Sequence, residues 1–223
     1  TKDEEKKISG RKKLYSIMEM ANDFFMNNLL SDNRALGYLN ERGINKEIIL
    51  EYKIGYAKDN FSSLHKYLLD KDTLNEDILL AGLIIKSEKK KNSYYDRYRD
   101  RIIFPITNTY GKIVGFGGRV INEDDKPKYM NSPETEIFHK GNLLFNYSNI
   151  KSPVKEIDNL VVVEGYMDAI SLCSQGFKNV VAPLGTAMTE RQLNLIWDLV
   201  DSPIVCFDGD KAGKKAAERV IEL

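Results

Sequence analysis

Hydrophobic residues recur at helical spacing near the start of the chain. Seven of them fall on one face of an α-helix: Leu14, Ile17, Met18, Ala21, Phe24, Phe25 and Leu29. This pattern predicts a long amphipathic helix that packs on the body of the protein. Shorter helices are predicted over residues 34–42, after a cap at Asn45, from Ser62 or Ser63 to Leu69, and from Asn75 to Leu80.

The hydrophobic pattern changes to that of strands in the middle of the chain. Residues 102–106 and 112–120 read as two strands joined by a hairpin-like link, Asn108-Thr109-Tyr110-Gly111. The second strand carries Gly115, Gly117 and Gly118, and glycine in a strand interior often marks the close approach of another backbone or a ligand. We therefore expect a mixed α+β subdomain over residues 1–150.

Three short apolar runs dominate the last third of the chain. They lie in Leu160–Val163, Val180–Pro183 and Ile204–Phe207, and each is followed by a helical pattern. Alternating strands and helices predict βαβ units with a parallel sheet that is buried on both faces, so Cys206 is expected in a core strand. The second of these helices should bury Leu193, Ile196, Trp197 and Val200, and the third Ala212, Ala216, Ala217 and Val220.

Acidic residues follow the first and third of these strands. Glu164 and Asp168 come after the first, and Asp208 and Asp210 after the third. Carboxyl ends of parallel strands share one edge of a sheet, so these four groups are expected in one crevice, where their mutual repulsion favours a bound cation such as Mg²⁺ or Mn²⁺. The alternative is that Asp210 only caps the next helix and Glu164 is a solvated strand end.

Basic residues alternate with aromatic ones before the first central strand. Arg97, Arg99 and Arg101 would share one face of an extended chain that also contains tyrosines, and Arg119, Lys128 and Lys140 follow on loops or strand edges. A run of charges is usually a solvated face. The aromatic interleaving here predicts a nucleic-acid-binding track.

Composition restricts the class of protein only moderately. The chain has 223 residues, with 33 Lys and Arg balanced by 33 Asp and Glu, so any binding of a polyanion must rely on local charge. Its two cysteines form no metal-binding pattern, which is typical of a reduced cytoplasmic protein. No apolar run reaches membrane-spanning length.

The segments VVVEGYMD, LGTAMT and CFDGDKAG resemble the Toprim fold of topoisomerases and primases. Together with YLNERGINKEIILEYKIGYA, YYDRYRDRIIFPI, GKIVGFGGRV and PKYMNSPETEIFHKG, they resemble bacterial replicative primases of the DnaG type from about Arg34 to the end. The resemblance implies an α/β fold, with a Toprim subdomain over residues 151–223. It also implies a DNA-directed RNA polymerase that makes short RNA primers on single-stranded DNA.

The resemblance assigns roles to particular residues. Glu164, Asp208 and Asp210 are expected to be the catalytic acids and to bind two divalent ions with support from Asp168, and Glu164 is also a candidate general base. Template and nucleotides are expected to contact Arg97, Arg99, Arg101, Arg119, Lys128 and Lys140. Such contacts would be mainly to phosphate, without base readout.

The family has other parts that are expected to lie outside this sequence. The resemblance leads us to expect neither the zinc-binding domain nor the helicase-binding domain within these 223 residues, and a further Asp-x-Asp beyond Leu223. The chain is therefore expected to be a truncated piece with an incomplete Toprim subdomain. Two other functions stay open at this point: a different Toprim enzyme, such as a topoisomerase or nuclease, and a nucleic-acid-binding module whose acids are only structural.

Overall fold

The computed structural model describes residues 2–122, 124–150, 159–185 and 187–223. The chain divides into two compact units, one comprising residues 1–106 and 113–138 and the other residues 107–112 and 139–223. The boundary predicted between residues 150 and 151 lies at the edge of a segment, 151–158, that is outside the described residues.

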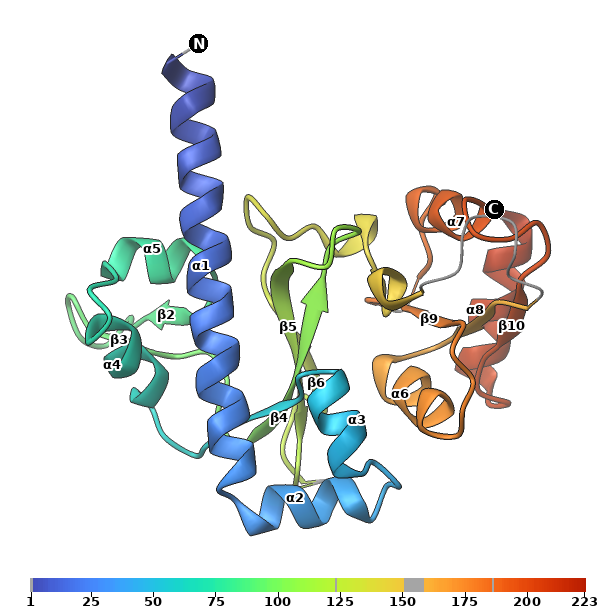
Figure 1. Ribbon diagram of the computed structural model, residues 1–223, viewed down its shortest axis with the longest axis horizontal. Helices are drawn as coiled ribbons and strands as arrows, with labels where there is room; N and C mark the ends of the chain where they lie inside the picture. The colour runs from blue at the N-terminus through green and yellow to red at the C-terminus, as the bar shows by residue number, and fades with distance from the viewer. Residues whose placement is uncertain (1, 123, 151–158, 186) are drawn as a thin grey trace. The chain divides into compact units, whose positions relative to one another are not determined.

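The first unit is a mixture of short helices and strands arranged around one long helix (Figure 1). Its elements are α1 (Lys2–Leu30), α2 (Asn33–Asn40), α3 (Lys46–Glu51), β1 (Gly55–Ala57), α4 (Ser63–Leu69), α5 (Asn75–Leu80), β2 (Ile84–Lys86), β3 (Tyr94–Asp96), β4 (Arg101–Thr107), β5 (Ile113–Val120) and β6 (Tyr129–Asn131). The helices and both long strands lie where the hydrophobic pattern predicts them.

Helix α1 supplies one wall of the first hydrophobic core. Its predicted apolar face is buried, with Ile17, Met18 and Phe25 at most 1% exposed. These side chains pack with residues of α4, α5 and the sheet, including Phe116 of β5. The N-terminal turns of α1 extend beyond the elements on which the helix packs (Figure 1).

A four-stranded sheet in the order β1-β4-β5-β6 forms the centre of this unit. A Cβ atom placed on Gly115 would lie 2.5 Å from the Phe138 ring, and one on Gly118 would lie 2.8 Å from Tyr98. Both glycines therefore make room for a close neighbour, but the neighbours are aromatic side chains of the same unit and not the backbone or ligand that the sequence pattern predicted.

The second unit contains the parallel sheet. Its elements are a 3₁₀ turn at Lys140–Asn142, β7 (Leu144–Phe145), a 3₁₀ turn at Tyr147–Asn149, β8 (Val161–Val163), α6 (Tyr166–Ser174), β9 (Val180–Pro183), α7 (Glu190–Trp197), β10 (Ile204–Cys206) and α8 (Lys211–Glu222). The strand order is β10-β8-β9-β7, with β8 parallel to both of its neighbours and β7 antiparallel to β9. The predicted βαβ order is confirmed.

The predictions of burial for β10 and for Trp197 of α7 are wrong. Strand β10 is exposed along its length, with Ile204 at 49% and Cys206 on the surface, because among the described strands it is an edge with one neighbour. Trp197 is 53% exposed rather than in the core. Gln192 is buried and donates to the carbonyls of Lys140 and Leu143, which turns the buried stripe of α7 away from Trp197.

Helix α8 also differs from the predicted pattern at its start. Ala212 is exposed, whereas Gly213 is buried against the backbone of Asp208. Ala216, Ala217 and Val220 are half-buried, and Val220 packs on the second hydrophobic core. In the described part of the chain, no helix combines the length and apolarity needed to cross a membrane.

Candidate active site and nucleic-acid-binding surface

The carboxyl ends of β8 and β10 bring two of the predicted acids to the same edge of the sheet. The strands pair in parallel with Val163 opposite Cys206, so Glu164 and Phe207 each continue one of the two strands. Glu164 is half-buried, and its Oε2 atom accepts a hydrogen bond from the backbone N–H of Asp208 at 3.4 Å. The sheet register therefore places a carboxylate beside the start of the Asp208-Gly209-Asp210 loop.

The other two acids are held at helix starts. Asp210 caps α8, with Oδ1 accepting the backbone N–H groups of Ala212 and Gly213 at 2.9 and 2.8 Å. Asp168 accepts the backbone N–H of Gly165 at 3.1 Å and so closes the first turn of α6. The predicted helix-cap contact of Asp210 is thus confirmed, while its role beyond the cap stays a prediction. A cap uses one carboxylate oxygen and is compatible with a ligand role for the other.

Within the described ranges, no group of three or more His, Cys, Asp or Glu side chains is arranged to hold a metal ion. The structure joins Glu164 to the Asp208 backbone but does not gather all four acids around one point. Mg²⁺ usually accepts one or two protein carboxylates and keeps several waters. The oxygen donors at this sheet edge therefore fit that ion chemically, and the ligand set stays a prediction.

The three predicted arginines of the Arg97–Arg101 segment do not share a face, which corrects the prediction. Asp100 between them has a φ of 47°, in the left-handed region, and this interrupts the alternation of an extended chain. Arg97 donates through Nε to the Gly82 carbonyl at 2.9 Å. Arg101 is only 6% exposed and donates to the Pro127 carbonyl at 2.8 Å. Arg101 is therefore a structural support of the loop that carries Lys128.

Arg99 lies within a small aromatic cluster that we call the Arg99 stack, made of Phe61, Tyr95 and Arg99. The guanidinium carbon is 4.7 Å from the centroid of the Phe61 ring and 5.3 Å from that of Tyr95. Arg99 also donates to the carbonyl of Asp96. Phe61 is 64% exposed, so the cluster combines a fixed cation with an accessible aromatic face.

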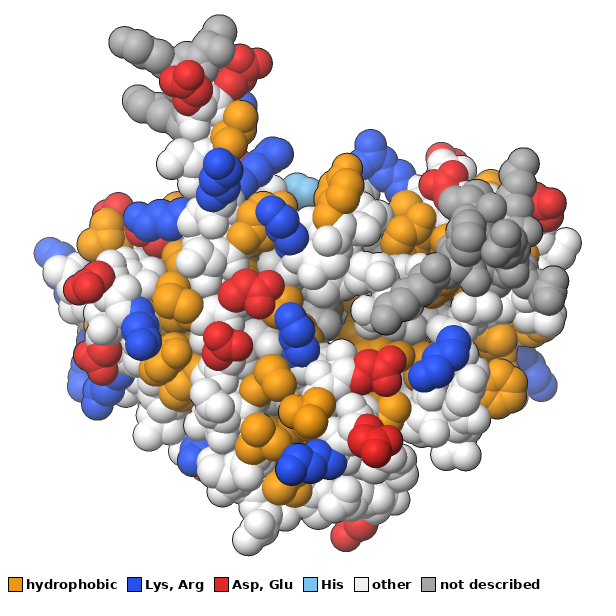
Figure 2. Space-filling model, viewed as in Figure 1, with side chains coloured by type: hydrophobic (Ala, Val, Ile, Leu, Met, Phe, Trp, Pro, Cys, Tyr) orange, Lys and Arg blue, Asp and Glu red, His pale blue; other side chains and the backbone are white. Residues whose placement is uncertain are grey.

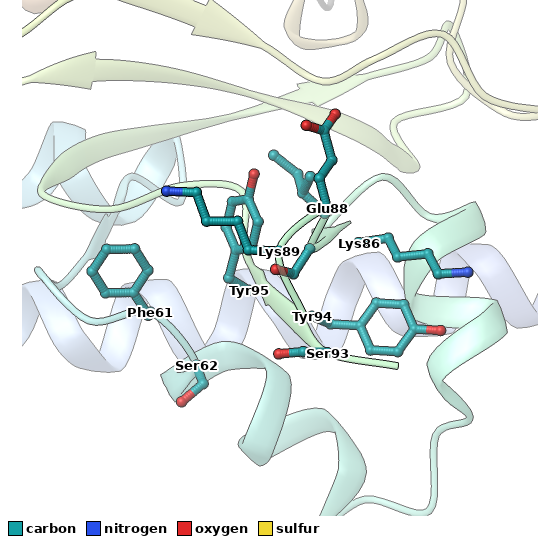
Figure 3. A pocket seen from close by; sticks show the side chains of 10 residues that line it. Phe61, Ser62, Lys86, Glu88, Lys89, Ser93, Tyr94 and Tyr95 are labelled. Atoms are coloured by element: carbon teal, nitrogen blue, oxygen red, sulfur yellow. The ribbon is translucent and has the colours of Figure 1, made fainter. Parts of the chain in front are cut away.

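A pocket of about 650 Å³ opens beside the Arg99 stack. Phe61 and Tyr95 line it together with residues of β2 and of the loop that joins β2 to β3. In Figure 3, Lys89 extends over Tyr95 toward Phe61, while Lys86 and Tyr94 point to the other side. Lys89 therefore places an ammonium group near the two aromatic rings of the Arg99 stack.

A second cluster, the Arg119 stack, contains Tyr38, Arg42, Arg119 and Tyr129. The guanidinium carbon of Arg42 lies 3.8 Å from the Tyr38 ring centroid, and that of Arg119 lies 5.0 Å from the Tyr129 centroid. Arg119 also donates to both tyrosine hydroxyls. Sequence reasoning missed Tyr38, Arg42 and Phe61; the four-residue spacing of Tyr38 and Arg42 was the available signal for the first two.

The remaining predicted lysines are exposed in different units. Lys128 is in the loop before β6, and Lys140 begins a 3₁₀ turn in the second unit. On the face drawn in Figure 2, Lys and Arg side chains are interspersed with Asp and Glu over α1, α2 and α3. On this face, therefore, positive charge does not gather into one continuous patch over these helices.

Comparison with known proteins identifies the family. A family model described as the N-terminal domain of the DNA primase catalytic core matches residues 24–151, more than half of the chain. The chain belongs to the DNA primase catalytic core family. A Toprim-like model matches residues 161–223, which contain the parallel sheet and all four acids.

Similar primases cover almost the whole chain. It is 43% identical over 213 residues to the DNA primase of Pseudomonas putida, a match of 94% of this chain and 32% of the relative. The DNA primase of Escherichia coli K12 is 37% identical over 214 residues, a match of 95% of this chain and 36% of the relative. The chain thus spans about a third of the length of these curated relatives.

Solved primase structures share the fold. A DnaG primase catalytic domain bound to single-stranded DNA is 36% identical with a TM-score of 0.87, covering 96% of this chain and 69% of that one. A DNA primase domain from Pseudomonas aeruginosa is 42% identical with a TM-score of 0.85, covering 94% of this chain and 65% of that one. The predicted fold class, a mixed α/β fold with a Toprim part, is confirmed.

Proposed function

We propose that this chain is the catalytic core of a primase that synthesises short RNA primers on single-stranded DNA. The observation that carries the proposal is the meeting of Glu164 with the Asp208-Gly209-Asp210 loop at the carboxyl ends of two parallel strands, in a chain of the primase family. In the reaction, the 3′ oxygen of one ribonucleotide attacks the α-phosphorus of the next, and pyrophosphate leaves.

We assign the acids to the metal-dependent part of this reaction. Glu164, Asp208 and Asp210 would hold Mg²⁺ or Mn²⁺, and Asp168 would support them from the first turn of α6. The bound ions would supply Lewis-acid stabilisation of charge on the triphosphate. Glu164, half-buried between the strand ends, is also a candidate acceptor of the 3′-hydroxyl proton.

Nucleic acid is assigned to the two arginine–aromatic stacks and the exposed lysines. Bases can stack on Phe61 and Tyr95, while Arg99, Arg119, Lys128 and Lys140 can neutralise phosphates without reading sequence. The support comes from the exposed aromatic ring beside a fixed guanidinium, and from the relative whose structure contains single-stranded DNA. Arg97 is bound to a carbonyl through Nε and can offer only its remaining N–H groups.

The test is primer synthesis from labelled ribonucleotides on a single-stranded template with saturating Mg²⁺. Asp208→Asn and Glu164→Gln should each lower the yield by about a hundredfold or more, the effect typical of losing an electrostatic catalytic group. Asp201→Asn is the matched control, because Asp201 is exposed and precedes β10, at the opposite end of that strand. It should keep wild-type yield.

Two results would count against the proposal. Wild-type primer yield from Asp208→Asn would refute the assignment of Asp208 as a catalytic, metal-binding acid. Nicking or relaxation of plasmid DNA by the wild-type chain, with no primer synthesis, would favour a different Toprim enzyme.

A further inference from the structure

The Asp96–Arg101 segment is anchored at both ends by carboxylates. At one end, Asp96 accepts the backbone N–H groups of Leu64 and His65 at 2.8 and 2.9 Å, and so caps α4 from a distant part of the chain. At the other end, Asp100 is fixed by side chains of α2 and β1. Arg99, the cation of the Arg99 stack, lies between these anchors.

Asp100 has three strong hydrogen bonds from two partners. Arg34 donates to both carboxylate oxygens, with Nη1–Oδ1 and Nη2–Oδ2 distances of 3.0 and 2.9 Å. Tyr56 donates its hydroxyl to Oδ1 at 2.6 Å. The Asp100 side chain is 19% exposed and Tyr56 is 3% exposed, whereas the Arg34 side chain is 54% exposed, so the tyrosine side of the contact is shielded from water and the arginine side faces it. A bidentate arginine–carboxylate pair is a geometrically specific bond.

This clamp also holds an uncommon backbone conformation. The φ of 47° at Asp100 turns the chain so that Arg101 enters the interior while Arg99 stays half-buried beside Phe61 and Tyr95. An arginine side chain has many rotamers, and its guanidinium reaches two rings and the Asp96 carbonyl only from a suitable backbone position. The orientation of Arg99 therefore depends on what fixes the residue after it.

We propose that Asp100, held by Arg34 and Tyr56, is a positioning residue that keeps Arg99 in its stack for binding single-stranded nucleic acid. The inference rests on the proposed function, because it assumes that the Arg99 stack contacts the template. Asp100 itself would contact no ligand and would act only through its neighbour.

Charge and positioning predict opposite effects for the same substitution. Removing a carboxylate near a basic surface strengthens binding of a polyanion if charge alone matters. Asp100→Asn should instead weaken it, because a neutral amide cannot make the charge-assisted bidentate pair with Arg34. Asparagine tolerates positive φ, so the backbone conformation remains accessible.

The experiment measures binding of a fluorescent single-stranded oligonucleotide by anisotropy. The variants are Asp100→Asn, Arg99→Ala, the double variant, and Tyr56→Phe, which loosens the clamp without changing charge. Asp70→Asn, at the exposed C-terminal end of α4, is the control for loss of one negative charge. All measurements are made at a temperature at which circular dichroism shows each variant folded.

We expect Asp100→Asn and Arg99→Ala each to raise the Kd roughly fivefold or more, the scale of losing one stacked or phosphate contact. The double variant should be no weaker than Arg99→Ala, and Tyr56→Phe should raise the Kd less, in the same direction. Asp70→Asn should leave the Kd unchanged or lower it slightly.

Several outcomes would overturn the proposal. One is tighter or unchanged binding by Asp100→Asn and Tyr56→Phe while Arg99→Ala weakens it, which would leave the proposed function standing. Another is that Asp100→Asn raises the Kd by the same factor in the Arg99→Ala variant as in the wild type. That result would mean that Asp100 affects binding without acting through Arg99. Failure of the wild-type chain to bind would refute this inference and the proposed function together.

Discussion

Individual residues of the basic track have different tasks, although the sequence places them in one pattern. Arg99 is half-buried and stacked on aromatic rings, whereas Arg101 is buried and holds the Pro127 carbonyl. Burying a guanidinium is tolerated when its N–H groups are satisfied. Alanine substitution at Arg101 would therefore disturb the fold first, and only residues such as Arg99 and Lys128 give a clean test of nucleic-acid binding.

The clamp on Asp100 should make stability depend on pH. Burial raises the pKa of Asp100, but hydrogen bonds from Arg34 and Tyr56 and the charges of Arg34 and Arg101 outweigh burial, so its pKa is lowered overall. A carboxyl whose folded-state pKa is depressed stabilises the fold above its unfolded pKa of about 3.9 and loses that contribution as pH falls below it.

We therefore expect the free energy of unfolding of Asp100→Asn to fall below wild type by about 1–3 kcal/mol at pH 7. The difference should shrink as pH falls from about 4 toward 2, because the wild-type carboxyl is then protonated. Urea unfolding of both proteins across this range checks it, with Asp70→Asn measured in parallel. A difference that stays constant or grows in acid would contradict the lowered pKa.

At the scale of elements, the start of α8 depends on a glycine. A Cβ atom on Gly213 would lie 2.2 Å from the Asp208 carbonyl oxygen, and its N–H also bonds to Asp210. The first turn of the helix therefore packs directly on the backbone of the acidic loop. A side chain at position 213 would displace either the first turn of α8 or the backbone of the acidic loop.

Gly213→Ala should lower the free energy of unfolding by about 1–3 kcal/mol, since a clash with backbone outweighs the gain in helix propensity. Gly10→Ala is the matched control: Gly10 is in α1 with nothing within 4 Å of an added Cβ, and the change should raise stability by about 0.5–1 kcal/mol. Urea unfolding measures both. A higher free energy of unfolding for Gly213→Ala would contradict this, because it would mean that the Asp208–Asp210 loop can move to make room for the methyl group at little cost.

At the scale of the whole molecule, β10 leaves an apolar strand exposed. Among the described strands it pairs only with β8, and Ile204 and Val205 are 49% and 38% exposed. The chain carries no net charge at pH 7, so electrostatic repulsion between copies is weak. Exposed strand edges of this kind favour pairing with another chain.

We expect the 223-residue chain to associate with rising concentration in sedimentation velocity at pH 7. Val205→Lys should reduce this association, because a lysine on an edge strand opposes edge-to-edge pairing. Lys215→Ala, on the exposed side of α8, controls for a change of charge in the same unit and should not reduce it. Equal association by wild type and Val205→Lys would assign the contact to another surface.

Much of this protein follows from the sequence alone. Apolar spacing located α1 and the βαβ order because periods of about 3.6 and 2 residues reflect backbone geometry that each element has by itself. The quoted motifs placed the chain in the primase family, which the comparisons confirm. The neighbouring strand ends of Glu164 and Asp208 also follow from local order, since parallel strands share one edge.

Tertiary structure decided what depends on residues far apart in the chain. The burial of Arg101, the exposure of Trp197 and Cys206, and the clamp on Asp100 by Arg34 and Tyr56 each need partners from other elements. Hydrophobic periodicity shows which residues lie on the apolar side of a helix or strand. Which side is buried depends on the other elements that pack against it. For the same reason the sequence could place basic residues near aromatic ones, while only the fold distinguishes the arginines that support it from those that remain accessible.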